Sequence, residues 1–381
     1  MRGQADRQLP LFHTFEVEDR IRADHPLRDF KRRVDRMLVS LSPQFEAAYS
    51  GTGRPSVPPE RLLKALLLMA VYSIRSERQL CEQIDLNLLF RWFLDMQPSE
   101  NAFDATTFTK NRQRLETHGL AKAFFDAVVA EALLNNLCSE HFSVDGTMIQ
   151  SFASTKSFRP KDEKDDQPPS DSNGFQPRNV EVDFHGQKRT NATHQSRTDP
   201  EAKLYRKGNS QEAKLAHGAH VLSENRNGLI LAVTSTEANG TAEREATLTM
   251  LDELKATHGR TPKTLGGDKG YDAGEFFQVL ERRKIEPHIP LANAVANPKT
   301  ETKPDRIPGI LARLRMQDRM GTEPYQLSQR CRKKVEECFG WLKQVAGLRR
   351  SRVVGRWKLQ QLLELSSAAF NLIRMKRLIP C

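Results

Sequence analysis

The segment Phe142-Ser143-Val144-Asp145-Gly146-Thr147 decides the fold of this chain. It is rich in β-forming residues and predicts a strand that continues to about Ile149. Two more strands are predicted over residues 214–222 and 228–236, because the turn between them, Glu224-Asn225-Arg226-Asn227-Gly228, holds residues that tolerate positive φ. We expect the three strands to run antiparallel. A lone carboxylate on a central strand costs free energy unless a positive group neutralises it, so Asp145 is the first candidate site residue.

Helices and strands alternate downstream of these three strands. The sequence predicts a helix over residues 243–256, a short strand at 264–265 that ends at Gly266-Gly267-Asp268, a helix over 275–283 and a strand over 285–289. A long helix is expected over 327–345 and a last one over 358–378. The order β-β-β-α-β-α-β-α predicts an α/β fold with a five-stranded sheet.

The stretch upstream of the first strand has helical periodicity. Helices are predicted from Pro59 to Val71, from Glu77 to Phe93, and from Asp104, an N-cap candidate, through Leu115. We therefore divide the chain into a helical domain over 1–137, a catalytic domain over 138–346 and a C-terminal helix over 347–381. A polar tract at about 158–209 interrupts the second domain, and we expect a flexible insertion or surface lobe that cannot form its own core.

Composition narrows the function. The 59 Lys and Arg residues exceed the 48 Asp and Glu residues and give a net charge of +11, which favours a polyanionic partner such as nucleic acid. The five cysteines form no Cys-x-x-Cys pair, so no zinc cluster or disulfide framework is indicated. No apolar run is long enough to span a membrane, and the beginning of the chain carries no apolar segment of a signal peptide. We expect a cytoplasmic protein that does not bind membranes.

Three acids are the candidate catalytic residues. Asp145 and Asp268 each follow a strand, and Glu336 lies on the long helix. Carboxylates from two strand ends and one helix can hold a pair of Mg²⁺ ions, with open positions for water and phosphate. At about 100° per residue, Glu336 shares a stripe of the helix with Arg332 and Lys343, while Glu337 points towards solvent. The alternative for Glu336 is a simple salt bridge with Arg332 one turn earlier.

A basic helix in the first domain is a candidate DNA contact. Lys110, Arg112 and Arg114 follow the predicted N-cap Asp104 on alternate positions. They could lie on a DNA backbone or groove. The alternative is the solvated face of an ordinary helical bundle.

The segments around the three acids, Val144 to Thr147, Gly267 to Asp272 and Arg332 to Lys343, resemble the three signatures of DDE transposases from prokaryotic insertion sequences. The likeness is greatest to the group called insertion-sequence family five and its family-four relatives. The third signature of that group is Tyr, two residues, Arg, three residues, Glu, six residues, Lys; this chain has Arg332, Glu336 and Lys343 at that spacing, with Gln329 at the tyrosine position. The likeness extends through the helical domain and covers nearly the whole chain. The other segments that carry the likeness are Asp24-His25-Pro26-Leu27-Arg28, Gly53-Arg54-Pro55-Ser56, Tyr72 to Leu80, Thr107 to Arg112, Glu224-Asn225-Arg226-Asn227-Gly228 and Gly240-Thr241-Ala242-Glu243-Arg244.

The resemblance implies an RNase H-like core, with a mixed five-stranded sheet, in which Asp145, Asp268 and Glu336 hold two Mg²⁺ ions that Mn²⁺ could replace. It implies a transposase that cuts and rejoins double-stranded DNA at the terminal inverted repeats of its element and inserts it into target DNA. Arg332, Lys343 and Lys269 would hold phosphates. We further expect a homo-oligomer on DNA, associated with the nucleoid. Two alternatives stay open: an inactive DNA-binding regulator derived from a transposase, and a metal-dependent nuclease on the same core.

Overall fold

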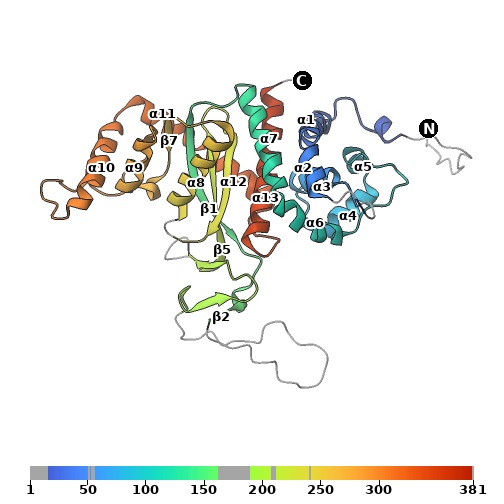
Figure 1. The fold of residues 1–381 in the computed structure, drawn as a ribbon, viewed down its shortest axis with the longest axis horizontal. Coiled ribbons are helices and arrows are strands. Elements are labelled where there is room, and N and C mark those ends of the chain that lie inside the picture. The colour runs from blue at the N-terminus through green and yellow to red at the C-terminus, as the bar shows by residue number, and fades with distance from the viewer. Residues whose placement is uncertain are drawn as a thin grey trace, which may run out of the picture.

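The computed structural model describes residues 16–49, 52, 56–161, 189–206, 212–239 and 242–379. Its first part is helical and lies to one side of the sheet (Figure 1). Much of the polar tract (162–188 and 207–211) and parts of two family-like segments (53–55 and 240–241) lie outside the described residues. Within the described ranges, no helix is both long enough and apolar enough to cross a membrane. The helical part begins with a short 3₁₀ turn, Val17–Arg20, followed by α1 (Pro26–Ser40), α2 (Ser42–Ala48), α3 (Pro59–Val71), α4 (Glu77–Leu86), α5 (Leu88–Phe93), α6 (Ala105–Thr117) and α7 (Leu120–Leu134).

Local capping explains where these helices begin and end. The Asp104 side chain accepts a hydrogen bond from the Thr106 N–H at 2.7 Å, so the predicted N-cap of α6 is confirmed. The predicted single helix over residues 77–93 is wrong, because it divides at Asn87. The backbone of Asn87 is extended and its side chain caps α5 by accepting from the Leu89 N–H at 2.9 Å.

The sheet confirms the predicted mixed arrangement of five strands. Its core order is β6 (Ile230–Glu237), β5 (Lys214–Glu224), β1 (His141–Gln150), β7 (Thr264–Gly266) and β8 (Glu286–His288). β6, β5 and β1 pair antiparallel, whereas β1, β7 and β8 pair parallel. This curled mixed sheet with helices is the RNase H-like architecture that the resemblance implies, and β1 lies at its centre (Figure 1).

A short sixth strand comes from the polar tract. β4 (Lys203–Tyr205) pairs with the start of β5, and β2 (Phe158–Pro160) pairs with β3 (His194–Ser196) as a separate ribbon. The described ends of this tract pack against residues outside it, because Phe158 and Ala202 form a small buried cluster with Ala153 and Leu215. The surface lobe is thus attached to the sheet by its own apolar contacts. The expectation that the tract forms no core of its own stays a prediction.

Helices surround the sheet in the order expected, with two differences. The helices are α8 (Ala242–His258), α9 (Gly274–Arg282), α10 (Ile307–Arg319), α11 (Glu323–Arg332), α12 (Lys334–Gln344) and α13 (Arg356–Leu378). α10 was not predicted. The expected single helix over 327–345 divides into α11 and α12 at Lys333, where the Glu336 N–H bonds to the Lys333 carbonyl in a tight i→i+3 turn.

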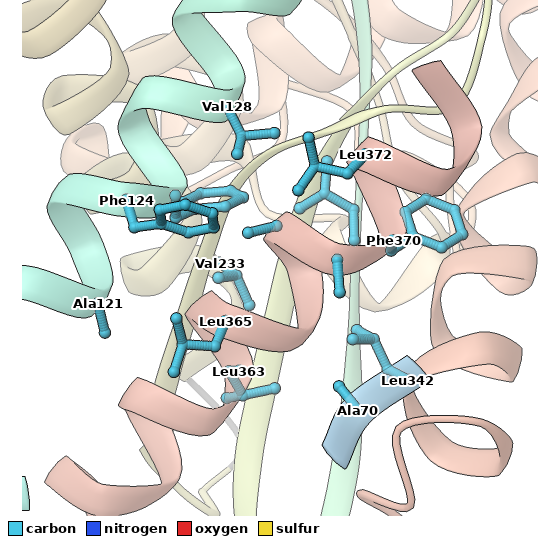
Figure 2. Close-up of a cluster of buried hydrophobic side chains, with 14 of the residues drawn as sticks. Ala70, Ala121, Phe124, Val128, Val233, Leu342, Leu363, Leu365, Phe370 and Leu372 are labelled. Carbon is cyan, nitrogen blue, oxygen red and sulfur yellow. The ribbon is translucent and has the colours of Figure 1, made fainter. Parts of the chain in front are cut away.

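The last helix joins the two parts of the molecule. Figure 2 shows Leu363, Leu365 and Leu372 of α13 in one cluster with Phe124 on α7 and Val233 on β6. These residues belong to one continuous apolar core that runs from the N-terminal helices to the sheet. The proposed boundaries near residues 137 and 346 therefore stay predictions, since the hydrophobic core crosses both.

Candidate active site

Asp145 lies in the middle of β1, with its side chain 21% exposed. Its Oδ1 accepts a hydrogen bond from the Gly146 N–H at 2.8 Å, and its Oδ2 lies 3.6 Å from Nη1 of Arg332. Burial, together with the negative charges of Asp268 and Glu336, raises the pKa of Asp145 to about 6 against the opposing effects of the Gly146 hydrogen bond and Arg332. A nearby cation would therefore stabilise the charged form of the Asp145 carboxylate.

Strand register places Asp268 beside Asp145. Ser143 of β1 is the partner of Gly266 of β7 in a parallel pair, and each aspartate follows its partner residue by two positions. The charge of Asp268 also acts on Asp145, so the two aspartates lie near each other where β7 ends beside the middle of β1. The Oδ1 of Asp268 accepts from the Gly270 N–H at 2.8 Å, which holds the side chain as the cap of a short 3₁₀ turn, Lys269–Tyr271.

Glu336 comes to the same site from α12. It is exposed, and its charge acts on Asp145. The neighbouring Glu337 turns towards α13, where its Oε2 lies 2.9 Å from Nη1 of Arg374. The alternative of a salt bridge between Arg332 and Glu336 is not supported, because the carboxylate that Arg332 approaches is that of Asp145.

The site can supply hard oxygen ligands, but its carboxylates are spread around it. Among the described residues, no three His, Cys, Asp or Glu side chains are already gathered tightly enough to hold one ion. Burial is the main cause of the raised pKa of Asp145, and the like charges of Asp268 and Glu336 add to it. The donor set fits a divalent cation in kind and charge, and binding requires the side chains to close on it.

Basic and polar side chains anchor the site. The Lys343 ammonium donates to the Thr147 hydroxyl, two residues beyond Asp145, while Lys269 is exposed directly after Asp268. Gln329, at the position of the signature tyrosine, donates from Nε2 to the His288 carbonyl at 2.5 Å and to the Gly267 carbonyl at 3.4 Å. Gln329 thereby ties α11 to the ends of β7 and β8.

Glu243 is the acid that the sequence analysis did not select. It lies in the first turn of α8, and its Oε1 is 2.9 Å from the point that a Cβ on Gly146 would occupy, while its Oε2 is 3.5 Å from the corresponding point on Gly270. Burial and the charges of Asp268 and Asp145 raise its pKa. The signal was present in the segment Gly240-Thr241-Ala242-Glu243-Arg244, but nothing local distinguishes Glu243 from Glu245.

Comparison with known families decides the identity. The family described as "Transposase DDE domain" matches residues 137–372, which is more than half of the chain and includes all three candidate acids. The chain belongs to the DDE transposase family. A second family, "Transposase domain (DUF772)", matches residues 15–114 of this transposase. A search of curated proteins found no match to the chain.

Solved structures of another transposase are also similar. One is the Mos1 transposase paired-end complex with left transposon end, which is 12% identical, with 78% of this chain and 81% of that chain covered and a TM-score of 0.21. Another is the Mos1 Strand Transfer Complex, which is 13% identical, with 80% and 82% of the two chains covered and a TM-score of 0.20.

The three basic residues of α6 do not form one exposed stripe on this DDE transposase. Lys110 is exposed, but Arg112 forms an ion pair with Glu77 and its side chain is only 14% exposed. The guanidinium of Arg114 stacks 4.4 Å from the ring centre of Tyr49 and donates to Asn111. Alternate positions of a helix lie about 200° apart, so the three charges face different surroundings.

A basic groove instead runs between the helical part and the catalytic core. It encloses about 1270 Å³ and lies between α4 and α6 on one wall and the segment from Lys343 to Val353 on the other. Within the described residues, the exposed side chains of Arg75, Arg78 and Arg349 on this groove form no hydrogen bond or ion pair. Its remaining basic residues are Arg112, Lys343, Arg350 and Arg352.

Proposed function

We propose that this transposase cleaves DNA strands at the ends of an insertion sequence and transfers the freed ends to target DNA. The observation that supports the proposal is that β1 and β7 pair directly before Asp145 and Asp268, and that the charges of Asp268 and Glu336 both act on Asp145. Three carboxylates at one sheet edge are costly for folding, and a divalent cation is the partner that offsets this cost.

Asp145, Asp268 and Glu336 would hold two Mg²⁺ ions, for which Mn²⁺ could substitute. When bound, such ions activate the attacking oxygen and stabilise the leaving oxygen of an in-line phosphoryl transfer. The chain's own contribution is to position the DNA. Arg332 lies 3.6 Å from Asp145 and would hold a phosphate beside the acids.

Lys343 and Lys269 add two positive charges to that of Arg332 near the acids. Lys343 donates to Thr147, two residues beyond Asp145, and the exposed Lys269 directly follows Asp268. Ammonium groups at these positions would fix the phosphates on both sides of the bond that is cut. The reaction needs no covalent enzyme intermediate, so the chain requires no nucleophilic side chain.

The basic groove would bind the double-stranded DNA of the element end as it continues from the acids. Arg75, Arg78 and Arg349 offer free charges to the backbone, and Phe152 on the same groove is 51% exposed and could stack on a base. Lys110 lies outside this lining and remains a candidate contact on the outer face of α6. Joining two element ends to a target further implies a homo-oligomer on DNA.

A cleavage assay tests the function. Linear DNA that carries the element's own ends is incubated with the protein in Mg²⁺, Mn²⁺ or EDTA, with a supercoiled target plasmid present. We expect metal-dependent cuts at the element ends and joined products, and Asp268→Asn should bind the DNA without cutting it. Binding without cuts in every metal would identify a regulator, and cuts without joined products would identify a nuclease.

Salt dependence tests the groove separately. Arg75→Ala with Arg349→Ala removes two phosphate contacts, so the slope of log K against log salt should become less steep by about 2. Lys255→Ala with Arg260→Ala removes the same charge from exposed positions outside the groove, and its slope should match that of the wild type. Equal slopes for both double variants would contradict the proposed DNA path.

A further inference from the structure

Glu243 occupies a position between the two aspartates of the site. One oxygen of its carboxylate lies against Gly146, the residue after Asp145, and the other lies towards Gly270, whose N–H holds Asp268. A Cβ on Gly146 would be only 2.9 Å from the Glu243 Oε1, closer than real Cβ contacts come. The absence of a side chain on Gly146 therefore leaves the space through which Glu243 reaches the site.

A second, independent group points into the same space. His220 is paired with Gly146 across β1 and β5, and it is only 1% exposed. Its Nε2 shares a hydrogen bond with the Thr236 hydroxyl at 2.8 Å, whereas its Nδ1 has no partner among the described residues and lies 2.9 Å from the position of a Cβ on Gly146. A buried ring nitrogen without a partner costs free energy, and a bound ion with its water molecules would supply that partner.

We propose that Glu243 is a fourth carboxylate of the divalent-metal site, which enters from the first turn of α8 and binds the ion between Asp145 and Asp268. This inference rests on the proposed function, because it assigns a further ligand to the same site. With a fourth carboxylate, the negative charge of the acids equals in size the positive charge of two divalent cations, which suits a two-ion site. His220 would act as a positioning residue that hydrogen-bonds water on the ion.

The competing explanation for Glu243 is an ordinary acid at a helix N-terminus. Both Glu243 and Glu245 lie in the first turn of α8, where a negative charge stabilises the helix. Glu245 is exposed, whereas Glu243 is partly buried and its carboxylate oxygens lie close to Gly146 and Gly270. The two glutamates thus share the helix dipole but differ in access to the site, which makes Glu245 the matched control.

Metal-induced stabilisation distinguishes these roles without an activity measurement. The thermal midpoint of the full chain is measured in EDTA and at increasing Mn²⁺ for the wild type, Glu243→Gln, Glu245→Gln and Asp145→Asn. We expect Glu243→Gln to need at least about tenfold more Mn²⁺ for half-maximal stabilisation, and Glu245→Gln to behave as the wild type. In EDTA, Glu243→Gln should be as stable as the wild type or more so, because it removes repulsion between carboxylates.

Two results would overturn the inference. One is a Glu243→Gln variant that is less stable in EDTA but responds to Mn²⁺ as the wild type does, which would make Glu243 a helix-dipole residue. The other is a wild type that does not respond to Mn²⁺ at all. The second result would also remove the proposed metal-dependent function, whereas a normal wild-type response that is lost only in Asp145→Asn would refute the role of Glu243 alone.

Discussion

Replacing Asp145 with asparagine should stabilise the metal-free protein at neutral pH. The substitution keeps the size of the side chain and an oxygen that can accept from the Gly146 N–H. It removes a negative charge that is buried near two other acids, Asp268 and Glu336, and only partly balanced by Arg332. Catalytic residues are held in arrangements that cost stability, so a variant that loses function and gains stability is the expected signature.

The size and sign of this effect follow from the pKa of Asp145. The folded protein raises the pKa from 3.8 to about 6, a difference of about 2 units that corresponds to up to about 3 kcal/mol. Well below pH 3.8 the carboxyl is protonated in both the folded and the unfolded chain, and it costs nothing. As the pH rises through 6 the wild type loses this free energy of unfolding, whereas Asp145→Asn does not.

Denaturant unfolding in EDTA between pH 4 and 8 measures the difference. The two proteins should have similar midpoints at pH 4, and the variant should be the more stable by 1 to 3 kcal/mol at pH 8, on the scale of the expected shift. Mn²⁺ should then stabilise the wild type and leave Asp145→Asn nearly unchanged. A variant that is less stable than the wild type by the same amount at every pH would refute the reasoning, because Asp145 would then be a favourable structural partner.

Three further perturbations test other parts of the structure. Glu336→Gln should lower strand cleavage by orders of magnitude while DNA binding persists. Glu337→Gln, on the side of α12 that faces α13, should cut normally. Cleavage and gel-shift assays that show the reverse would exchange the roles of the two glutamates. Glu364→Gln should stabilise the protein by up to about 3 kcal/mol above pH 7 and not at all well below pH 4.5, because burial raises the pKa of Glu364 to about 7. A difference between the unfolding midpoints of variant and wild type that does not change with pH would contradict this. Gly146→Ala should destabilise by about 1 to 3 kcal/mol through clashes with the buried His220 ring and with Glu243. Gly340→Ala, in open space on α12, should be neutral or stabilising in the same unfolding assay.

The sheet and its acids were predictable because their signals are local. The β-forming run around Val144 and the glycines before Asp268 each mark a strand end within a few residues. Helical periodicity separates Glu336 from Glu337, and the structure turns Glu337 towards Arg374 on α13. Helix breaks were harder to predict, since Lys333 keeps helical dihedral angles and only its hydrogen-bond pattern tightens.

The sequence alone therefore determined the order of the five core strands and the family, and it selected three candidate acids, because each is written in a short pattern of neighbouring residues. The tertiary structure alone decided which charges remain free. Arg112 is neutralised by Glu77 on another helix, Arg332 approaches Asp145 on β1, and Glu243 enters a space left by Gly146. Periodicity specifies the face of an element, but the partner on that face depends on how elements far apart in the chain pack together.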